Sequence, residues 1–461
     1  MQQKYFFTLN LILFSLIVIL ISGFLIFPVL SSDCGYYLSI AKEIYIGKIY
    51  FKEIASSYNP LAILLLGLPY IFSNHPPIQI FLLINLFFII GTSFVIFKII
   101  SLKIQSNLEI IFYLLLFILG TINLEARSIL LEPISVFFQI TGFYFYLKSR
   151  NNSNFYLLFI SGILISMSFL SKQYGLFIFG AIGIDMILYR KRILFKSTIL
   201  MFGFLIPILI FYAYLSSYDV KLQEFVNYIL GKGSKLDIGN GTGIYYSFKT
   251  FVICTTVFVI ANSYVLIVPI FILKIKNIFK NENLIYILAL LFSFLILTKA
   301  SFYHYYQYIL PYCIIVFAIL DIHNKNKFTN FLKNISFFGS ILFMGYTNLK
   351  PLIKNTKSEY EIQKQTAATI NKFIPKKSKV FLNGISQEYY YLCDFNSMNL
   401  SKIGYSFPEY FFTETIVKNM DSGSYILISN NNIKVYSKFL NLYTLNKIKL
   451  NNKICFIMKK K

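Results

Sequence analysis

The sequence is short of charge, and of acidic charge most of all. Only 13% of its 461 residues are charged, and 19 Asp and Glu stand against 43 Lys and Arg. A soluble protein carries about twice that charged fraction, which indicates a membrane protein. Cysteine is scarce as well: the five cysteines form no CxxC pair and no cluster with histidine, which argues against a zinc site. A Cys393–Cys455 disulfide stays open, because spacing alone cannot establish one.

Long apolar runs take the place of the missing charge. Hydrophobic residues make up 57% of the chain, and the mean hydropathy is +0.65. A run of roughly 20 apolar residues crosses a hydrocarbon core about 30 Å thick. The first run has no small-residue cleavage site and is too long for a signal peptide, so we expect a retained helix. The sequence predicts an α-helical polytopic membrane protein with about eleven spans, near residues 8–30, 78–97, 108–124, 128–147, 155–171, 173–189, 197–214, 250–273, 284–298, 306–322 and 331–348.

The formal net charge of +24 is explained by where the basic residues lie. With the N-terminus inside, the predicted inner segments hold 15 basic residues, whereas three short outer turns hold only Arg127, Lys172 and Lys299. This asymmetry follows the positive-inside rule. It predicts a multi-pass protein of the inner (cytoplasmic) membrane with a cytoplasmic N-terminus. It also argues against nucleic acid as a partner.

Two long loops are predicted at the outer face. Residues 31–77 contain an amphipathic stretch, Tyr36–Tyr50, that suits a helix on the membrane surface. Residues 215–249 end in a Gly-rich run that lacks the GxxxxGK[ST] order of a phosphate loop. We expect this second loop to be a flap that closes over a site, and a passive linker is the alternative.

The C-terminal part changes character. Residues 349–461 are rich in Lys and Asn, and strand-like runs alternate there with helical stretches. This pattern predicts an α/β domain of about 110 residues, large enough for its own core. An odd number of spans places it on the extracytoplasmic side of the membrane, after a transmembrane domain formed by residues 1–348.

The first apolar run ends in a carboxylate. Asp33 follows the predicted span 8–30 and precedes Tyr36 and Tyr37. An ionisable group at the bilayer interface is costly unless it has a partner or a task. One interpretation is a solvated or helix-capping carboxylate. The other is a general base, tuned by partial burial beside the tyrosines.

Arg127 and Glu132 lie at the third outer turn. Glu132 is about one turn inside the fourth span, where an acidic residue needs a partner. Arg127 is five positions earlier, too far round the helix for an ideal pair, so the partner can come from another helix. The structural interpretation is an ion pair between helices. The functional one is that Arg127 binds a phosphate through its planar fork, while Glu132 positions that phosphate or the acceptor and orients Arg127.

Other polar residues interrupt the outer turns. Lys172 and Gln173 separate the fifth and sixth spans, where a lysine either snorkels to the interface or contacts a phosphate. Lys299 and His304 precede the tenth span, in an aromatic-rich turn typical of an aromatic belt. Together, outer cations suit a phosphate-bearing lipid headgroup, and a carboxylate suits deprotonation of an acceptor hydroxyl. Such a transfer needs positioning and charge stabilisation more than a metal; no cofactor is required, and a divalent metal stays open.

Four segments resemble those of GT-C-fold membrane glycosyltransferases, in particular the bacterial relatives of protein O-mannosyltransferases and the aminoarabinose transferases. Their order and outer placement cover most of residues 1–320. The segments are Asp33–Lys42 with Gly47 and Tyr50 downstream, Tyr58–Leu61, Ala126–Glu132 and His304–Pro311.

The resemblance implies an inverting sugar transfer from a polyprenyl-phosphate donor, with Asp33 as the base. We expect Arg127, Lys172 and His304 to bind the donor phosphate, with supporting roles for Glu132, Tyr36, Tyr58, Asn59, Gln173 and Lys299. Three departures stand out: Cys34 replaces a frequent second acidic residue, Asn59 a frequent lysine, and Glu132 an aspartate.

The predicted acceptor is a hydroxyl of a glycan, lipid or protein, in cell-envelope glycan or glycoprotein assembly. The sugar, the acceptor and the oligomeric state stay open. One alternative is a transporter or flippase for lipid-linked sugars, although its ionisable residues would lie near the bilayer midplane. Another is a membrane anchor whose tail binds a partner.

Overall fold

The structure is a computed structural model. It describes residues 30–54, 58–104, 107–123, 128–152, 154–189, 193–230, 243–262, 281–298, 303–323, 358–397, 420–450 and 453–461, with Leu25, Pro28, Ser56 and scattered positions between 331 and 346.

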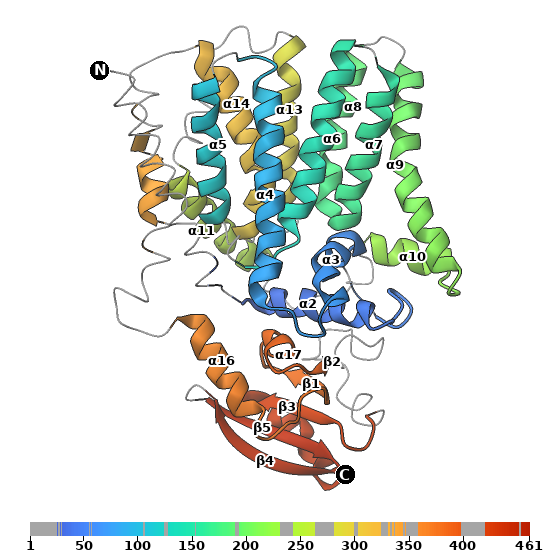
Figure 1. Ribbon diagram of the computed structural model, residues 1–461, viewed down its shortest axis with the longest axis vertical. Helices are drawn as coiled ribbons and strands as arrows, with labels where there is room; N and C mark the ends of the chain where they lie inside the picture. Colours follow the sequence, from blue (N-terminus) through green and yellow to red (C-terminus); the bar gives the residue numbers. More distant parts are fainter. Residues whose placement is uncertain are drawn as a thin grey trace.

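A bundle of apolar helices forms the larger part of the described chain (Figure 1). The 3-10 turn η3 (Gln173–Phe177) precedes α8, η6 (Leu295–Thr298) extends α13, and η7 (Tyr303–Tyr308) precedes α14. The helices of the bundle are α4 (Ile78–Ile100), α5 (Asn107–Thr121), α6 (Glu132–Asn152), α7 (Phe155–Ser171), α8 (Ile178–Tyr189), α9 (Ile193–Ser216), α11 (Gly243–Ala261), α13 (Asn281–Phe294) and α14 (Leu310–His323).

Two of the described helices, α4 and α9, are long and apolar enough to cross a membrane by length and composition. Shorter apolar helices occupy several of the other predicted spans. The predicted count of eleven spans is therefore not confirmed. The predicted span 8–30 lies outside the described residues except for Leu25, Pro28 and Leu30, and 250–273 and 331–348 are described only in part.

Three short helices lie at the end of the bundle that faces the C-terminal part: α2 (Ser32–Tyr45), α3 (Pro60–Gly67) and α10 (Leu222–Ile229) (Figure 1). The Ser31 hydroxyl caps α2 by accepting a hydrogen bond from the amide of Cys34 at 3.2 Å. Asp33 lies in the first turn of α2, where the helix dipole favours a carboxylate. The helix begins four residues before the predicted amphipathic stretch.

The C-terminal part is an α/β unit, as the sequence predicts. Its sheet has the order β2-β1-β3-β5-β4, parallel at β2-β1-β3 and antiparallel at β3-β5-β4. The two faces of the sheet alternate along β1: Val380 and Leu382 pack with Ile370 of α16, and Phe381 packs on the opposite face. The elements are α16 (Glu359–Ile370), α17 (Glu388–Leu392), β1 (Lys379–Asn383), β2 (Asn396–Ser397), β3 (Tyr425–Ser429), η8 (Asn430–Leu442), β4 (Tyr443–Leu450) and β5 (Lys453–Lys460).

Cys393 and Cys455 both lie in the core of this α/β unit, and both are free thiols. Burial raises the pKa of the Cys393 thiol above its ordinary value, which keeps it protonated and unreactive. The disulfide that the sequence leaves open is not formed in this structure.

Two glycines set the close approach of α7 and α9. A Cβ on Gly162 would lie 2.2 Å from the carbonyl oxygen of Leu200, and one on Gly203 would lie 2.2 Å from that of Phe159. Small residues that let two backbones meet are typical of helix pairs in membranes. The α7–α9 contact therefore depends on the absence of side chains at these two positions.

We predict that Gly162→Ala lowers the thermal unfolding temperature of the detergent-purified protein by several degrees, because a main-chain oxygen cannot move aside as a side chain would. Gly183→Ala in α8 is the matched control, since nothing lies within 4 Å of a Cβ there. It should hold or raise the unfolding temperature, because alanine favours a helix over glycine by about 0.8–1 kcal/mol. Equal unfolding temperatures for the two variants would contradict the packing account.

Candidate active site

The described candidate residues gather at the end of the bundle that faces α2 and the α/β unit (Figure 1). They come from segments far apart in the sequence. Arg127 and Lys299 lie outside the described residues. The others lie in the first turns of α2 (Asp33, Tyr36), before α3 (Tyr58, Asn59), at the start of α6 (Glu132), at the α7–η3 junction (Lys172, Gln173) and in η7 (His304).

A buried ion pair between Lys172 and Glu132 lies at the centre of this group. The Lys172 Nζ contacts Glu132 Oε1, and the two side chains are 2% and 0% exposed. His304 Nε2 lies 3.7 Å from the same carboxylate oxygen. The sequence-based hypothesis has Glu132 orient Arg127; among the described residues, Lys172 is the ion-pair partner of Glu132, and the His304 ring lies beside the same carboxylate.

Local backbone structure explains why this pair can form. Glu132 is the first residue of α6, where the unpaired main-chain amides favour a carboxylate. Lys172 follows the last residue of α7 in an extended conformation, with φ −159° and ψ 138°. The helix therefore stops at Ser171, and the lysine side chain reaches across to the start of α6.

Tyrosine rings surround the Lys172 ammonium. Its Nζ lies 4.7 Å from the ring centroid of Tyr305, 5.8 Å from that of Tyr58 and 5.9 Å from that of Tyr174. The faces of aromatic rings attract a cation, and more strongly when water is excluded. These rings therefore help to stabilise the Lys172 ammonium in a position where it is buried away from water.

Tyr37 and Tyr58 connect Asp33 to this pair. Their ring centroids are 5.0 Å apart, and the Tyr36 centroid lies 5.7 Å from that of Tyr58. The pKa of the Tyr58 phenol is raised to about 12: burial and then the Asp33 carboxylate raise it, while Lys172 lowers it. Burial, and then Tyr58, Asp33 and Glu132, raise the pKa of Tyr37. Half-buried Asp33 and the buried pair therefore act on the same two phenols, as parts of one site.

The segment before α6 is tied to both neighbours. The Ser128 hydroxyl lies 3.0 Å from that of Ser31, the N-cap of α2. The Asn85 amide of α4, in the orientation that satisfies both its atoms, donates to the Leu130 carbonyl at 3.2 Å and accepts from the Leu130 amide at 2.9 Å. These bonds satisfy main-chain groups of a non-helical segment inside the bundle, and they place Glu132 beside the start of α2.

Asn59, where the relatives often carry a lysine, takes part in a main-chain contact. Its Nδ2 donates to the carbonyl oxygen of Phe169 in α7, and its Oδ1 lies 3.5 Å from Gln173 Nε2. Asn59 therefore joins the start of α3 to the end of α7, next to Lys172. Tyr174 and Tyr305 are not among the predicted site residues; the aromatic density of their segments is the signal that could have found them.

No metal centre accompanies the cluster: within the described ranges, no group of three or more His, Cys, Asp or Glu could hold an ion.

No protein-family model matches the chain, and no curated protein matches it in sequence. Solved structures match it along its whole length. ArnT from Cupriavidus metallidurans in the apo state has a TM-score of 0.67 at 10% identity, covering 98% of each chain. The same protein bound to undecaprenyl phosphate has a TM-score of 0.68 at 10% identity, covering 98% of this chain and 97% of ArnT. The chain has the GT-C fold.

A more distant match has the same fold. The Archaeoglobus fulgidus oligosaccharyltransferase, tethered to an acceptor peptide, gives a TM-score of 0.50 at 10% identity, over 94% of this chain and 70% of that one. The ArnT match extends through the C-terminal unit as well as the bundle, so the complete architecture is that of a GT-C protein. This confirms the fold that the four sequence segments imply.

We predict that Lys172→Met destabilises the protein by about 3–5 kcal/mol, because it leaves the buried Glu132 carboxylate without its cation. The double variant with Glu132→Gln should recover a large part of that loss, since a neutral amide costs less to bury and still accepts a hydrogen bond. Unfolding of the purified variants in denaturant measures both effects. A double variant no more stable than Lys172→Met would show that the ion pair is not what holds α6 and α7 together.

Proposed function

We propose that this protein is an integral membrane glycosyltransferase that moves a sugar from a polyprenyl-phosphate donor to an acceptor hydroxyl. The observation that carries the proposal is the position of Asp33 beside the buried Lys172–Glu132 pair, at one end of an apolar bundle with the GT-C fold. The structure of ArnT with undecaprenyl phosphate adds support, because a protein of this fold binds a polyprenyl phosphate.

In this scheme Asp33 is the general base. Its carboxylate takes the proton of the acceptor hydroxyl as the hydroxyl oxygen bonds to the anomeric carbon of the sugar. The bond from that carbon to the phosphate oxygen breaks, and the polyprenyl phosphate leaves with the electron pair. A single displacement of this kind inverts the anomeric configuration. The transfer is balanced without a cofactor.

The cations stabilise the leaving phosphate. We assign the direct contact to Arg127, helped by Lys172 and His304. A lysine ammonium has three N–H donors, so Lys172 can hold Glu132 and still present positive charge to a phosphate. Glu132 Oε2 is buried without a hydrogen-bond partner among the described residues, which supports its assignment as the group that also orients Arg127. Tyr36, Tyr58, Asn59, Gln173 and Lys299 are assigned to the walls of the site.

The charge distribution supports an orientation. Basic residues close α4 and α6 at the end away from the α/β unit, with Lys98 and Arg150 in the last turns. We place that end and the N-terminus in the cytoplasm. The site and the C-terminal domain 349–461 are then extracytoplasmic, at the outer face of the inner membrane. The enzyme would act in cell-envelope glycan or glycoprotein assembly.

We predict that Asp33→Asn lowers kcat for sugar transfer by about 10²–10⁴-fold, the usual contribution of a general base. Affinity for the donor should stay within about twofold of the native value, because the assigned phosphate contacts are cations elsewhere in the site. The assay uses purified protein and a panel of labelled polyprenyl-phosphate sugars. Asp421→Asn is the matched control, since Asp421 is an exposed carboxylate of the α/β unit.

Undiminished transfer by a folded Asp33→Asn protein would show that Asp33 is not the general base. Tight donor binding without turnover by the native protein would favour the transporter or flippase over the enzyme.

A further inference from the structure

The α/β unit contacts the chain immediately before Asp33. The Gln363 Nε2 of α16 donates to the carbonyl oxygen of Leu30 at 2.8 Å and to Glu388 Oε1 at 3.2 Å. The main-chain amide of Gln387 donates to the Ser32 hydroxyl at 3.3 Å. These bonds reach the last residue before the N-cap of α2 and the first residue of the helix itself. The turn that carries Asp33 is therefore bonded to the C-terminal part of the chain.

A close main-chain contact is made at Gly35, in the first turn of α2. A Cβ there would lie 2.2 Å from the amide nitrogen of Glu388 and 2.3 Å from the carbonyl carbon and oxygen of Gln387. All three atoms are main chain, so no side-chain movement could make room. A glycine inside a helix costs about 0.5–1 kcal/mol relative to alanine. Here the glycine lets the start of α17 pack directly against α2, two residues after Asp33.

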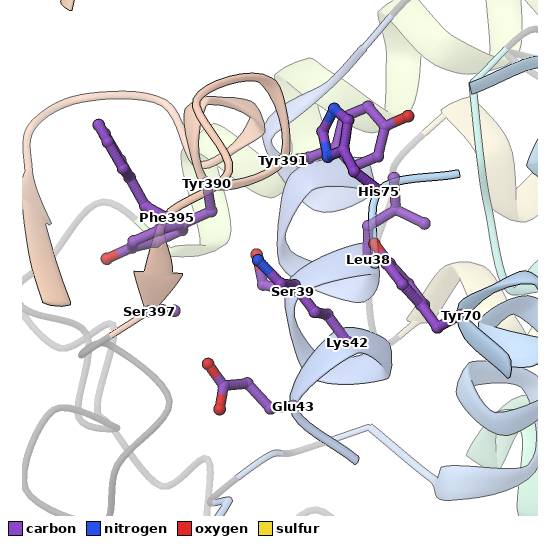
Figure 2. A pocket seen from close by; sticks show the side chains of 10 residues that line it. All are labelled: Leu38, Ser39, Lys42, Glu43, Tyr70, His75, Tyr390, Tyr391, Phe395 and Ser397. Atoms are coloured by element: carbon purple, nitrogen blue, oxygen red, sulfur yellow. The ribbon is translucent and has the colours of Figure 1, made fainter. Parts of the chain in front are cut away.

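A second contact fixes the other end of α2. Lys42 in its last turn forms an ion pair with Asp394 at 2.7 Å, and each side chain is 13% exposed. Between the two ends lies a small pocket, where Ser39 and Lys42 of α2 face Tyr390 and Phe395 (Figure 2). The α/β unit therefore contacts α2 near both of its ends, and two separated contacts fix the orientation of α2 relative to the α/β unit.

The opposite side of α2 rests on the bundle. Ser31 contacts Ser128 at 3.0 Å, and Cys34 and Ile129 belong to the same buried core of the bundle. Cys34 and Gly35 are both buried. The first turn of α2 is consequently held between the segment that leads to Glu132 and the start of α17.

We propose that the α/β unit is a positioning element of the active site, which holds the first turn of α2 so that Asp33 faces the acceptor, through Gly35 and the Lys42–Asp394 pair. This inference rests on the proposed function, in which Asp33 is the base. Donor binding is assigned to bundle residues, so it does not depend on this docking. Loosening the docking should therefore slow the transfer step and leave donor affinity unchanged.

The first test is Gly35→Ala in the full-length protein. We expect kcat to fall by about 10²-fold, the size of effect that a misplacement of about 1 Å produces, with donor affinity within about twofold of the native value. Hydrogen–deuterium exchange should show faster exchange at residues 32–36 and 387–391. Gly183→Ala, which has open space for a Cβ, is the control and should change neither quantity.

The second test leaves Gly35 and its main-chain contact unchanged. Asp394 has φ 55°, a conformation that Asn tolerates as well as Asp, so Asp394→Asn removes charge without backbone strain. Asp394→Asn and Lys42→Met should each lower kcat and speed exchange at residues 32–36, the double variant should be no worse than either single one, and Lys42→Arg should retain native behaviour. Additive losses in the double variant would overturn the role of the pair.

The results separate this inference from the proposed function. Faster exchange at residues 32–36 with unchanged kcat would overturn the positioning role and leave the glycosyltransferase standing. Unchanged exchange in Gly35→Ala would overturn the docking itself. Absence of transfer by the native protein would overturn the proposed function and the catalytic part of the inference, and the exchange data would still decide whether the α/β unit holds α2.

Discussion

The arrangement of the site depends on one buried ion pair, between Lys172 and Glu132. Removing two charges from water costs several kcal/mol per ion, and their mutual attraction repays that cost only with good geometry and further partners. Here the partners are the start of α6, three tyrosine rings and His304. Because Glu132 begins α6 and Lys172 directly follows α7, the pair fixes α6 against α7.

The other groups of the site are arranged around these two helix ends. Asn59 donates a hydrogen bond to the main chain of α7 at Phe169, close to the C-terminal end of that helix. Ser128, in the segment before α6, contacts Ser31, the residue before α2. Asp33 and the Lys172–Glu132 pair are thus held in place by polar contacts at the ends of the helices that carry them. In the proposed reaction, this preorganisation lets the site stabilise a leaving phosphate without moving its own charges.

Much of the architecture could be predicted from the sequence, because apolar runs, basic inner segments and a polar tail are strong signals. The tail is α/β, and the fold is the one that the four segments imply. The sequence also indicates that Glu132 needs a partner. It could not identify Lys172 as that partner, because the pairing depends on how two helices pack, across 40 positions of the chain. The docking of α17 on α2 has only one local trace, a glycine inside a helical stretch. The span count is the weakest prediction, since turns such as η3 and η7 interrupt or shorten the apolar helices.

The most direct test of the central claim is to find where the donor phosphate binds. A polyprenyl-phosphate probe with a photoreactive group beside the phosphate would be crosslinked to the full-length protein in vesicles, and the labelled peptides identified by mass spectrometry. We expect labels at residues 31–37, 58–60, 127–132, 172–174 or 303–308, competed by unlabelled undecaprenyl phosphate. Labels confined to the opposite ends of the helices, such as residues 98–104 or 148–152, would contradict the account.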